Sequence, residues 1–243
     1  MPRGTAIRAV QPHVLMADLA EPFAYSQAWY RKRGAMLVEI TTEDGIIGWG
    51  EAFGPAELTA PIVTWLAPLL LGQDALAREA LWQTLYNRLR DHGQRGVVVE
   101  AISAIDIALW DIAGQALGLP VHRLLGGPLR MQVDAYATGY YRRDRDDHIA
   151  YLTEGAGQRL AEGFRWLKLK TGWGLAEDIA LTRAFRAAIG PGVGLMVDCN
   201  HAYDAVSAIA YGRAVADCDI AWFEEPVPPE DIAGYQEVRR GQP

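Results

Sequence analysis

Three short polar motifs in this 243-residue chain carry residue types able to perform acid–base or metal chemistry. They are Lys168-Leu169-Lys170, Asp198-Cys199-Asn200 and Glu224-Glu225-Pro226, and each comes at the end of an apolar run. Residues i and i+2 of a β-strand point to the same face, so the two lysines share one side of their strand. The motifs are spaced by roughly one strand-plus-helix unit, and the parallel strands of a barrel end at one shared pocket. We therefore expect two ammonium groups and two carboxylates to converge.

The lysine pair is the candidate acid–base group. An unpaired charge on a buried strand costs several kcal/mol, so both lysines need partners or a wet pocket. Repulsion between two neighbouring ammonium groups lowers the pKa of one of them from its reference of about 10.4. Lys170, nearer the C-terminal end of the strand, is the candidate base, and Lys168 would tune Lys170 and attract an anionic substrate. The alternative is that both lysines lie on a solvated strand end.

The carboxylates are candidate metal ligands. Asp198 and Glu224 are 26 residues apart, which fits one strand-plus-helix unit, and carboxylate oxygens suit a magnesium ion. A third ligand is then expected on the next strand, about 25 residues later and beyond Pro243. Two structural alternatives stay open: Asn200 could cap the following helix, and Glu224 with Glu225 could be solvated loop charge.

Composition excludes several other classes of function. The chain has 23 basic and 30 acidic residues, a net charge of −7, and no basic run that would contact nucleic acid. The apolar stretch at residues 62–71 is interrupted by Thr64 and Pro68 and is shorter than the roughly 20 residues of a membrane span. Cys199 and Cys218 are too few for a disulfide framework. We expect a cytoplasmic protein without nucleic-acid or membrane partners.

The first half of the chain reads as an α+β region. Apolar patterning predicts three antiparallel strands, at Ile7–Leu15, Met36–Ile40 and Ile46–Trp49. A helix is predicted from an N-cap near Asp74, and a second from Val97 to Ala116. The break at residues 126–128, Gly-Gly-Pro, predicts a domain boundary, giving domains at 1–125 and 126–243.

The second half alternates strands and helices, which is typical of parallel βαβ units. The predicted strands are Val133–Ala137, Phe164–Lys170, Val193–Asp198 and Ala221–Glu224, with helices over residues 149–160 and 176–189. Four parallel strands do not close a barrel, which needs roughly eight. The region is therefore either a complete open sheet or the front part of a longer barrel.

The ordered set of motifs resembles the enolase superfamily, mandelate racemase/muconate lactonizing enzyme group. Four further segments look like galactarolactone cycloisomerases and sugar-acid dehydratases: Arg90–Gly96, Ile105–Asp111, Tyr136–Gly139 and Trp222–Pro226. The resemblance implies an α/β protein, with an α+β capping domain at 1–125 followed by the first half of a (β/α) barrel at 126–243. It also implies a lid made by residues 23–30 and 50–55.

The resemblance further implies a reaction: magnesium-dependent abstraction of a proton α to the carboxylate of a sugar acid or its lactone, giving dehydration or cycloisomerisation. Asp198, Glu224 and a third acid would bind Mg2+, and Lys170 would be one of two bases. Lys168 would lie against the substrate carboxylate, and Asn200 would hydrogen-bond near the metal or substrate. The small-molecule partner is then a sugar acid or lactone.

Members of this group are longer than this chain, so the chain is interpreted as the N-terminal portion of an enzyme that forms a homo-oligomer at full length. The third metal ligand and the opposing base would lie beyond Pro243. Two alternatives remain open: a racemase or epimerase of the same superfamily, and a truncated, inactive remnant that acts only as a binding partner.

Overall fold

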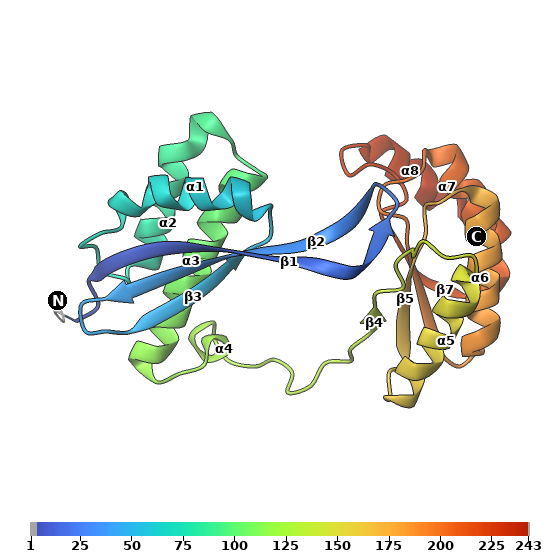
Figure 1. Ribbon diagram of the computed structural model, residues 1–243, viewed down its shortest axis with the longest axis horizontal. Coiled ribbons are helices and arrows are strands. Elements are labelled where there is room, and N and C mark those ends of the chain that lie inside the picture. Colours follow the sequence, from blue (N-terminus) through green and yellow to red (C-terminus); the bar gives the residue numbers. More distant parts are fainter. Residues whose placement is uncertain (1–3, 243) are drawn as a thin grey trace. The chain divides into compact units, whose positions relative to one another are not determined.

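The computed structural model describes residues 4–242, which form two compact units (Figure 1). Within these residues the first unit comprises 4–18 and 32–131, and the second comprises 19–31 and 132–242. The boundary expected between residues 125 and 126 stays a prediction. The structure adds that residues 19–31, from the first half of the chain, group with the second unit.

A three-stranded sheet forms one layer of the first unit. Its strands β1 (Ile7–Tyr25), β2 (Ala28–Thr42) and β3 (Ile47–Ala52) lie in that order, with β2 antiparallel to β3. The predicted meander is confirmed. However, β1 continues well beyond its predicted end at Leu15, and β2 begins well before its predicted start at Met36. Their added residues are mostly exposed, so they carry no apolar periodicity that would predict a strand.

Helices pack on this sheet. They are α1 (Ala56–Leu66), α2 (Arg78–Leu89), α3 (Val97–Leu117) and α4 (Val121–Leu124), with 3₁₀ turns at Ala67–Leu69 and Arg90–His92. Helix α3 lies very close to β3, because a Cβ on Gly50 would be 1.9 Å from the carbonyl oxygen of Ala104. A glycine is therefore required at this crossing, and it lets the apolar face of α3 reach the sheet.

One expectation for these helices is wrong, and one helix was not predicted. Helix α2 begins at Arg78 rather than at Asp74, whose Oδ1 instead accepts hydrogen bonds from the Thr5 hydroxyl and the Leu76 N–H. The side chain that suggested a helix cap thus stabilises a turn that precedes the helix. Helix α1 was not predicted, because Pro55 and Pro61 interrupt the sequence around its apolar positions.

The second unit holds a parallel sheet, confirming the predicted α/β class. Strands β4 (Ala137–Thr138), β5 (Trp166–Lys170), β6 (Gly194–Asp198) and β7 (Ile220–Glu224) lie in sequence order. Helices α5 (His148–Ala161), α6 (Leu175–Ile189), α7 (Ala205–Ala214) and α8 (Ile232–Gly241) follow the strands, with a 3₁₀ turn at Ala216–Cys218. The helices cover one face of the sheet (Figure 1).

The strand predicted at Val133–Ala137 is wrong over most of its length. Only Ala137 and Thr138 pair with β5, and residues 133–136 are exposed. Alternating apolar residues suggested a strand there, but the segment finds no neighbouring strand to pair with before Ala137. The remaining three predicted strands are confirmed with small changes at their ends.

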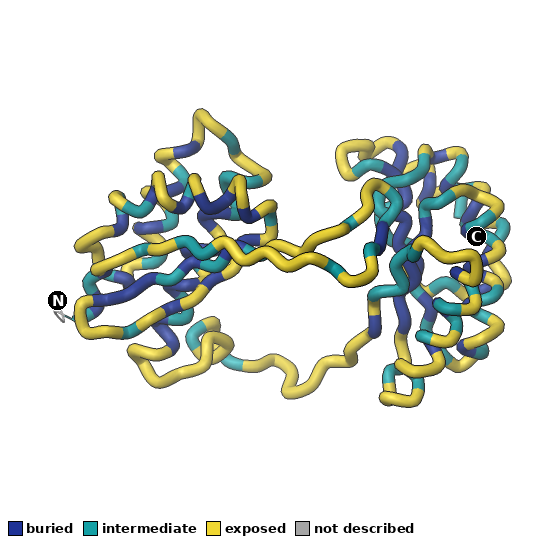
Figure 2. The backbone as a smooth tube through the Cα atoms, viewed as in Figure 1, coloured by how far each residue is buried: buried dark blue, intermediate teal, exposed yellow. Residues whose placement is uncertain are grey.

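Alternation along the buried strands decides which side chains reach the helices. Leu167 and Leu169 of β5 pack with Leu195 of β6 and with Phe185 of α6 in one apolar cluster. Figure 2 shows the buried central strands of this unit. Because successive side chains point to opposite faces, the residues between these leucines face away from the helices. None of the helices in the described part of the chain combines the length and hydropathy of a membrane span.

Candidate active site

Three of the predicted site residues lie side by side at the ends of neighbouring strands. Lys170 of β5 is in register with Asp198 of β6, which is in register with Glu224 of β7. The ammonium Nζ of Lys170 donates to Asp198 Oδ2 at 2.5 Å. Asp198 is 1% exposed and Lys170 is 9% exposed, so this ion pair is buried. The convergence expected from sequence is therefore present in the structure.

Lys168 bridges the two carboxylates. Its Nζ lies 2.7 Å from Glu224 Oε2 and 3.7 Å from Asp198 Oδ2, and only 7% of the residue is exposed. Burial lowers the pKa of Lys168, but the hydrogen bond to Glu224 and the charges of both carboxylates raise it by more, so the net shift is upward. Lys168 is therefore held as an ammonium, because its attraction to the two carboxylates outweighs the effect of burial.

Asn200 lies at the rim of the same site in an unusual backbone conformation. Asn200, His201 and Glu225 all have positive φ angles, of 46°, 61° and 45°. The Asn200 amide donates to Glu225 Oε2 at 3.3 Å, and His201 Nδ1 lies 3.4 Å from the same oxygen. Asn200 Oδ1 is buried and has no hydrogen-bond partner among the described residues. Left-handed, strained residues of this kind cluster at functional sites.

The turn between β1 and β2 contacts this rim. The Ser26 hydroxyl donates to the carbonyl oxygen of Asn200 at 2.8 Å, and the Gln27 amide donates to the same oxygen at 3.2 Å. Both residues belong to the part of the hairpin that groups with the second unit. The segment expected to act as a lid, residues 23–30, therefore contacts a residue of the candidate site.

Two tyrosines that the sequence reading did not assign to the site lie over its lysines. The ring centroid of Tyr136 is 5.2 Å from Lys168 Nζ, and that of Tyr141 is 5.6 Å from Lys170 Nζ. Tyr141 also contacts Phe23 of the hairpin, with ring centroids 4.6 Å apart. In the sequence, Tyr136 begins one of the segments that resemble the family, whereas no motif contains Tyr141. The rings add an aromatic wall next to the ammonium groups.

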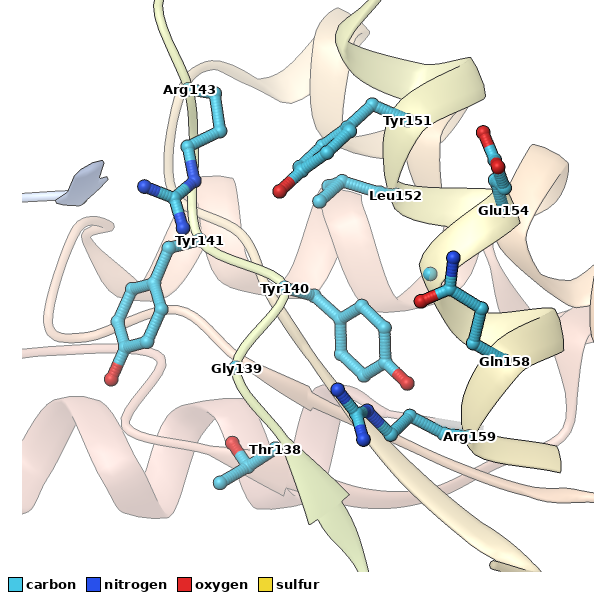
Figure 3. Close-up of a pocket in the computed structure, with 11 residues that line it drawn as sticks. Thr138, Gly139, Tyr140, Tyr141, Arg143, Tyr151, Leu152, Glu154, Gln158 and Arg159 are labelled. Atoms are coloured by element: carbon cyan, nitrogen blue, oxygen red, sulfur yellow. The ribbon is translucent and has the colours of Figure 1, made fainter. Parts of the chain in front are cut away.

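A separate cavity of about 300 Å3 lies between the loop after β4 and helix α5 (Figure 3). Tyr140 points toward α5 in this view, and its neighbour Tyr141 points the other way. The Tyr140 hydroxyl is buried and has no hydrogen-bond partner within residues 4–242, and burial raises its pKa to about 12. None of the four charged residues of the candidate site lines this cavity, so the cavity is not the place where a substrate would meet the lysines and carboxylates.

The carboxylate oxygens of Asp198 and Glu224 are suitable ligands for a cation that prefers oxygen. In this structure one positive group, the ammonium of Lys168, already lies against an oxygen of each carboxylate. Magnesium is commonly held by one or two carboxylates together with substrate and water oxygens. Residues 4–242 contain no cluster of three acidic, histidine or cysteine side chains able to hold a metal. Two carboxylates are thus what the described chain offers.

Comparison with known proteins agrees with this arrangement. Residues 8–126 match the family described as mandelate racemase / muconate lactonizing enzyme, N-terminal domain, and residues 151–243 match the enolase C-terminal domain-like family. The chain belongs to the mandelate racemase/muconate lactonizing enzyme group of the enolase superfamily. The resemblance seen in the sequence and the predicted fold class, a capping domain followed by part of a barrel, are confirmed.

Relatives in the superfamily include enzymes acting on sugar acids. D-galactarolactone cycloisomerase of Agrobacterium fabrum is 46% identical over 98% of this chain and 63% of its own length. Arabinonate dehydratase of Saccharolobus solfataricus is 37% identical over 79% of this chain and 52% of its own length. A crystal structure of a Streptomyces coelicolor racemase with bound magnesium matches with a TM-score of 0.90 and 33% identity. The match covers 97% of this chain and 67% of the racemase chain. The chain thus spans about half to two thirds of these superfamily members.

Proposed function

We propose that this chain supplies one side of a magnesium-dependent site that removes a proton α to the carboxylate of a sugar acid or its lactone. The observation that carries the proposal is the alternating pattern of Lys170, Asp198, Lys168 and Glu224 at the ends of three adjacent parallel strands. The names of the sugar-acid cycloisomerase and dehydratase relatives support the substrate class.

In the proposed reaction Lys170 is the base. Its Nζ donates to Asp198 in this structure, so the Lys170 ammonium must first release a proton to solvent before it can act as a base. It then accepts the proton from the carbon next to the substrate carboxylate, and the electron pair of that C–H bond moves toward the carboxylate carbon. Lys168, held as an ammonium, binds the substrate carboxylate. The side-chain oxygen Oδ1 of Asn200, which is buried and has no hydrogen-bond partner among residues 4–242, accepts a substrate hydroxyl.

Asp198 and Glu224 would hold the magnesium ion, together with ligands from substrate, solvent or further chain. When bound, the ion would stabilise the negative charge that develops on the substrate carboxylate. Loss of the hydroxyl from the next carbon as water, with the proton returned by the Lys170 ammonium or by solvent, would give dehydration. Departure of the lactone ring oxygen from that carbon as a carboxylate would give an isomer of the lactone. The homo-oligomer expected at full length and the expected cytoplasmic location remain predictions.

Exchange of the α proton in D2O tests the proposal without depending on the later steps. The protein is incubated with magnesium and a panel of aldonates, aldarates and their lactones, and ¹H NMR follows the α-proton signal. We expect wild type to lose this signal for at least one compound, Lys170→Met to retain it, and Lys32→Met, a surface control, to behave like wild type. Wild type inert on the whole panel, or Lys170→Met as active as wild type, would overturn the proposal.

The same spectra separate the two reactions and the racemase alternative. A dehydratase yields a product with one water fewer, a cycloisomerase yields an isomer of the lactone, and a racemase or epimerase yields the inverted α carbon with deuterium incorporated. We favour cycloisomerisation, because the cycloisomerase named above is 46% identical to this chain and the dehydratase is 37% identical.

A further inference from the structure

A buried carboxylate behind the candidate site connects the loops that follow two of its strands. Asp178, in the first turns of α6, is fully buried. Its Oδ2 accepts the backbone N–H of Gly172 at 2.9 Å, of Trp173 at 3.1 Å and of Gly174 at 3.3 Å. It also accepts the hydroxyl of Tyr203. A single carboxylate therefore binds the loop after β5 and the loop after β6.

Helix geometry explains why an acid at this position can hold the preceding loop. The first N–H groups of a helix and the residues before it have no partners within the helix, and the helix N-terminus favours a negative charge. The helix begins at Leu175, and its N-cap residue, Gly174, has no side chain to act as an acceptor. Asp178 reaches back from within the helix to bind three consecutive N–H groups that would otherwise lack acceptors.

The loop that Asp178 holds is tightly enclosed. Gly172 has φ +102°, and a Cβ there would lie 2.6 Å from the carbonyl oxygen of Cys199 and 2.7 Å from the Cβ atoms of Ala202 and Ser26. Thr171, just before it, donates its N–H to the Asp198 carbonyl at 2.9 Å. This conformation is open to glycine and strained for other residues. A loop packed this closely cannot move without moving the backbone on both sides of it.

We propose that Asp178 is a positioning residue that keeps Lys170 and Asp198 aligned by holding together the loops after β5 and β6. Lys170 is two residues before Gly172, and Asp198 is five residues before Tyr203, so both arms of the carboxylate act close to the pair. The inference rests on the proposed function only in naming Lys170 and Asp198 as the reacting pair. Burial raises the pKa of Asp178, and its four hydrogen-bond donors oppose that rise, as expected for a carboxylate enclosed by donors.

One variant weakens both arms, and a second removes only the arm to the loop after β6. Asp178→Asn replaces one acceptor oxygen with an NH2 group that cannot accept the loop N–H groups. Tyr203→Phe removes only the hydroxyl donor and leaves the three backbone bonds. The matched control is Thr182→Val, because the Thr182 hydroxyl is also buried on α6 but bonds Tyr211 Oη of α7, at 2.7 Å, rather than Asp178.

The readouts separate positioning from general stability. Amide hydrogen exchange is measured at Gly172, Trp173 and Gly174, and ¹⁵N NMR follows the Nζ signal of Lys170, which is buried against Asp198. We expect Asp178→Asn to speed exchange at the three amides at least about tenfold and to abolish the ammonium signal. Tyr203→Phe should broaden that signal, and Thr182→Val should leave both readouts as in wild type while lowering the melting temperature.

Turnover supplies a second arm. With any substrate found in the exchange assay, a misplaced base should lower kcat of Asp178→Asn about 10- to 100-fold, with KM changed by less than about threefold. If wild type turns over nothing, the proposed function fails while the NMR readouts still test the positioning role. The positioning role is overturned if Asp178→Asn and Tyr203→Phe match Thr182→Val in both NMR readouts. If Asp178→Asn does not fold, Tyr203→Phe decides alone.

Discussion

Replacing Lys168 with methionine should destabilise the second unit far more than the same change at a surface ion pair. Lys168 Nζ lies 2.7 Å from Glu224 Oε2, and the lysine side chain is 8% exposed. At an effective dielectric of about 20, a pair at this distance attracts by about 6 kcal/mol before desolvation is counted. Removing one partner of a buried pair leaves the other charge uncompensated, typically at a cost of 3–5 kcal/mol. Because Glu224 is partly exposed, we expect a loss of about 3 kcal/mol.

The matched control is Lys32→Met. Lys32 Nζ lies 3.4 Å from Asp18 Oδ1, but these side chains are 65% and 82% exposed, so the change should cost less than about 1 kcal/mol. Urea denaturation followed by circular dichroism, in EDTA, measures both variants against wild type. The reasoning is refuted if Lys168→Met is no less stable than Lys32→Met.

Magnesium gives the same experiment a second arm. If a dication can take the place of the ammonium between Asp198 and Glu224, millimolar magnesium should stabilise Lys168→Met more than wild type. In wild type the ammonium competes for the same carboxylate oxygens. Equal or smaller magnesium stabilisation of the variant would show that the two carboxylates do not bind the ion in this chain.

Three further predictions concern the frame around the site. Arg186→Met should lower the free energy of unfolding by about 3 kcal/mol, because the Arg186 guanidinium donates to four backbone carbonyls. Arg183→Met, at an exposed position of the same helix, should lower it by less than about 1 kcal/mol. Similar losses for the two variants in urea denaturation would contradict this. Burial and neighbouring arginines lower the pKa of His148 below its usual 6.5, so the unfolded chain binds a proton at this residue more readily than the folded chain does. Stability should therefore fall as pH drops below about 6.5. In melting curves recorded at several pH values, His148→Leu should make this fall smaller. Gly50→Ala should lower the free energy of unfolding by at least about 2 kcal/mol, because the added methyl group would clash with α3. Gly157→Ala, at an open position of α5, should leave it unchanged or raise it by up to about 1 kcal/mol. Thermal melts of both variants test this difference.

The central elements of the site were predictable from sequence because strand alternation and parallel register are local rules. Lys168 and Lys170 face away from the helices since the leucines between and before them fill the core. Asp198 and Glu224 end successive strands of similar length, so their register follows from the strand-plus-helix spacing. No contact between distant segments was needed for these inferences.

What sequence could not provide depends on contacts between segments far apart in the chain. The pairing of Lys168 with Glu224 rather than repulsion from Lys170 decides its charge, and only the fold shows which neighbour is nearer. The carboxylate of Asp178 looks like any acid in a first helical turn until the loops around it are seen. Strand β4 pairs with β5 only at Ala137 and Thr138, and no pattern in residues 133–138 indicates so short a strand.

The hairpin of β1 and β2 has a consequence for how this protein can be recombined. Its tip, residues 19–31, groups with the second unit although its strands begin and end in the first. A chimera that joined this barrel segment to another protein's capping domain would exchange the tip too, replacing Ser26 at Asn200 and Phe23 at Tyr141. The two units therefore cannot be exchanged independently, because a new capping domain brings a new hairpin tip to the barrel segment. Chimeras should keep the hairpin of β1 and β2 together with its original barrel segment.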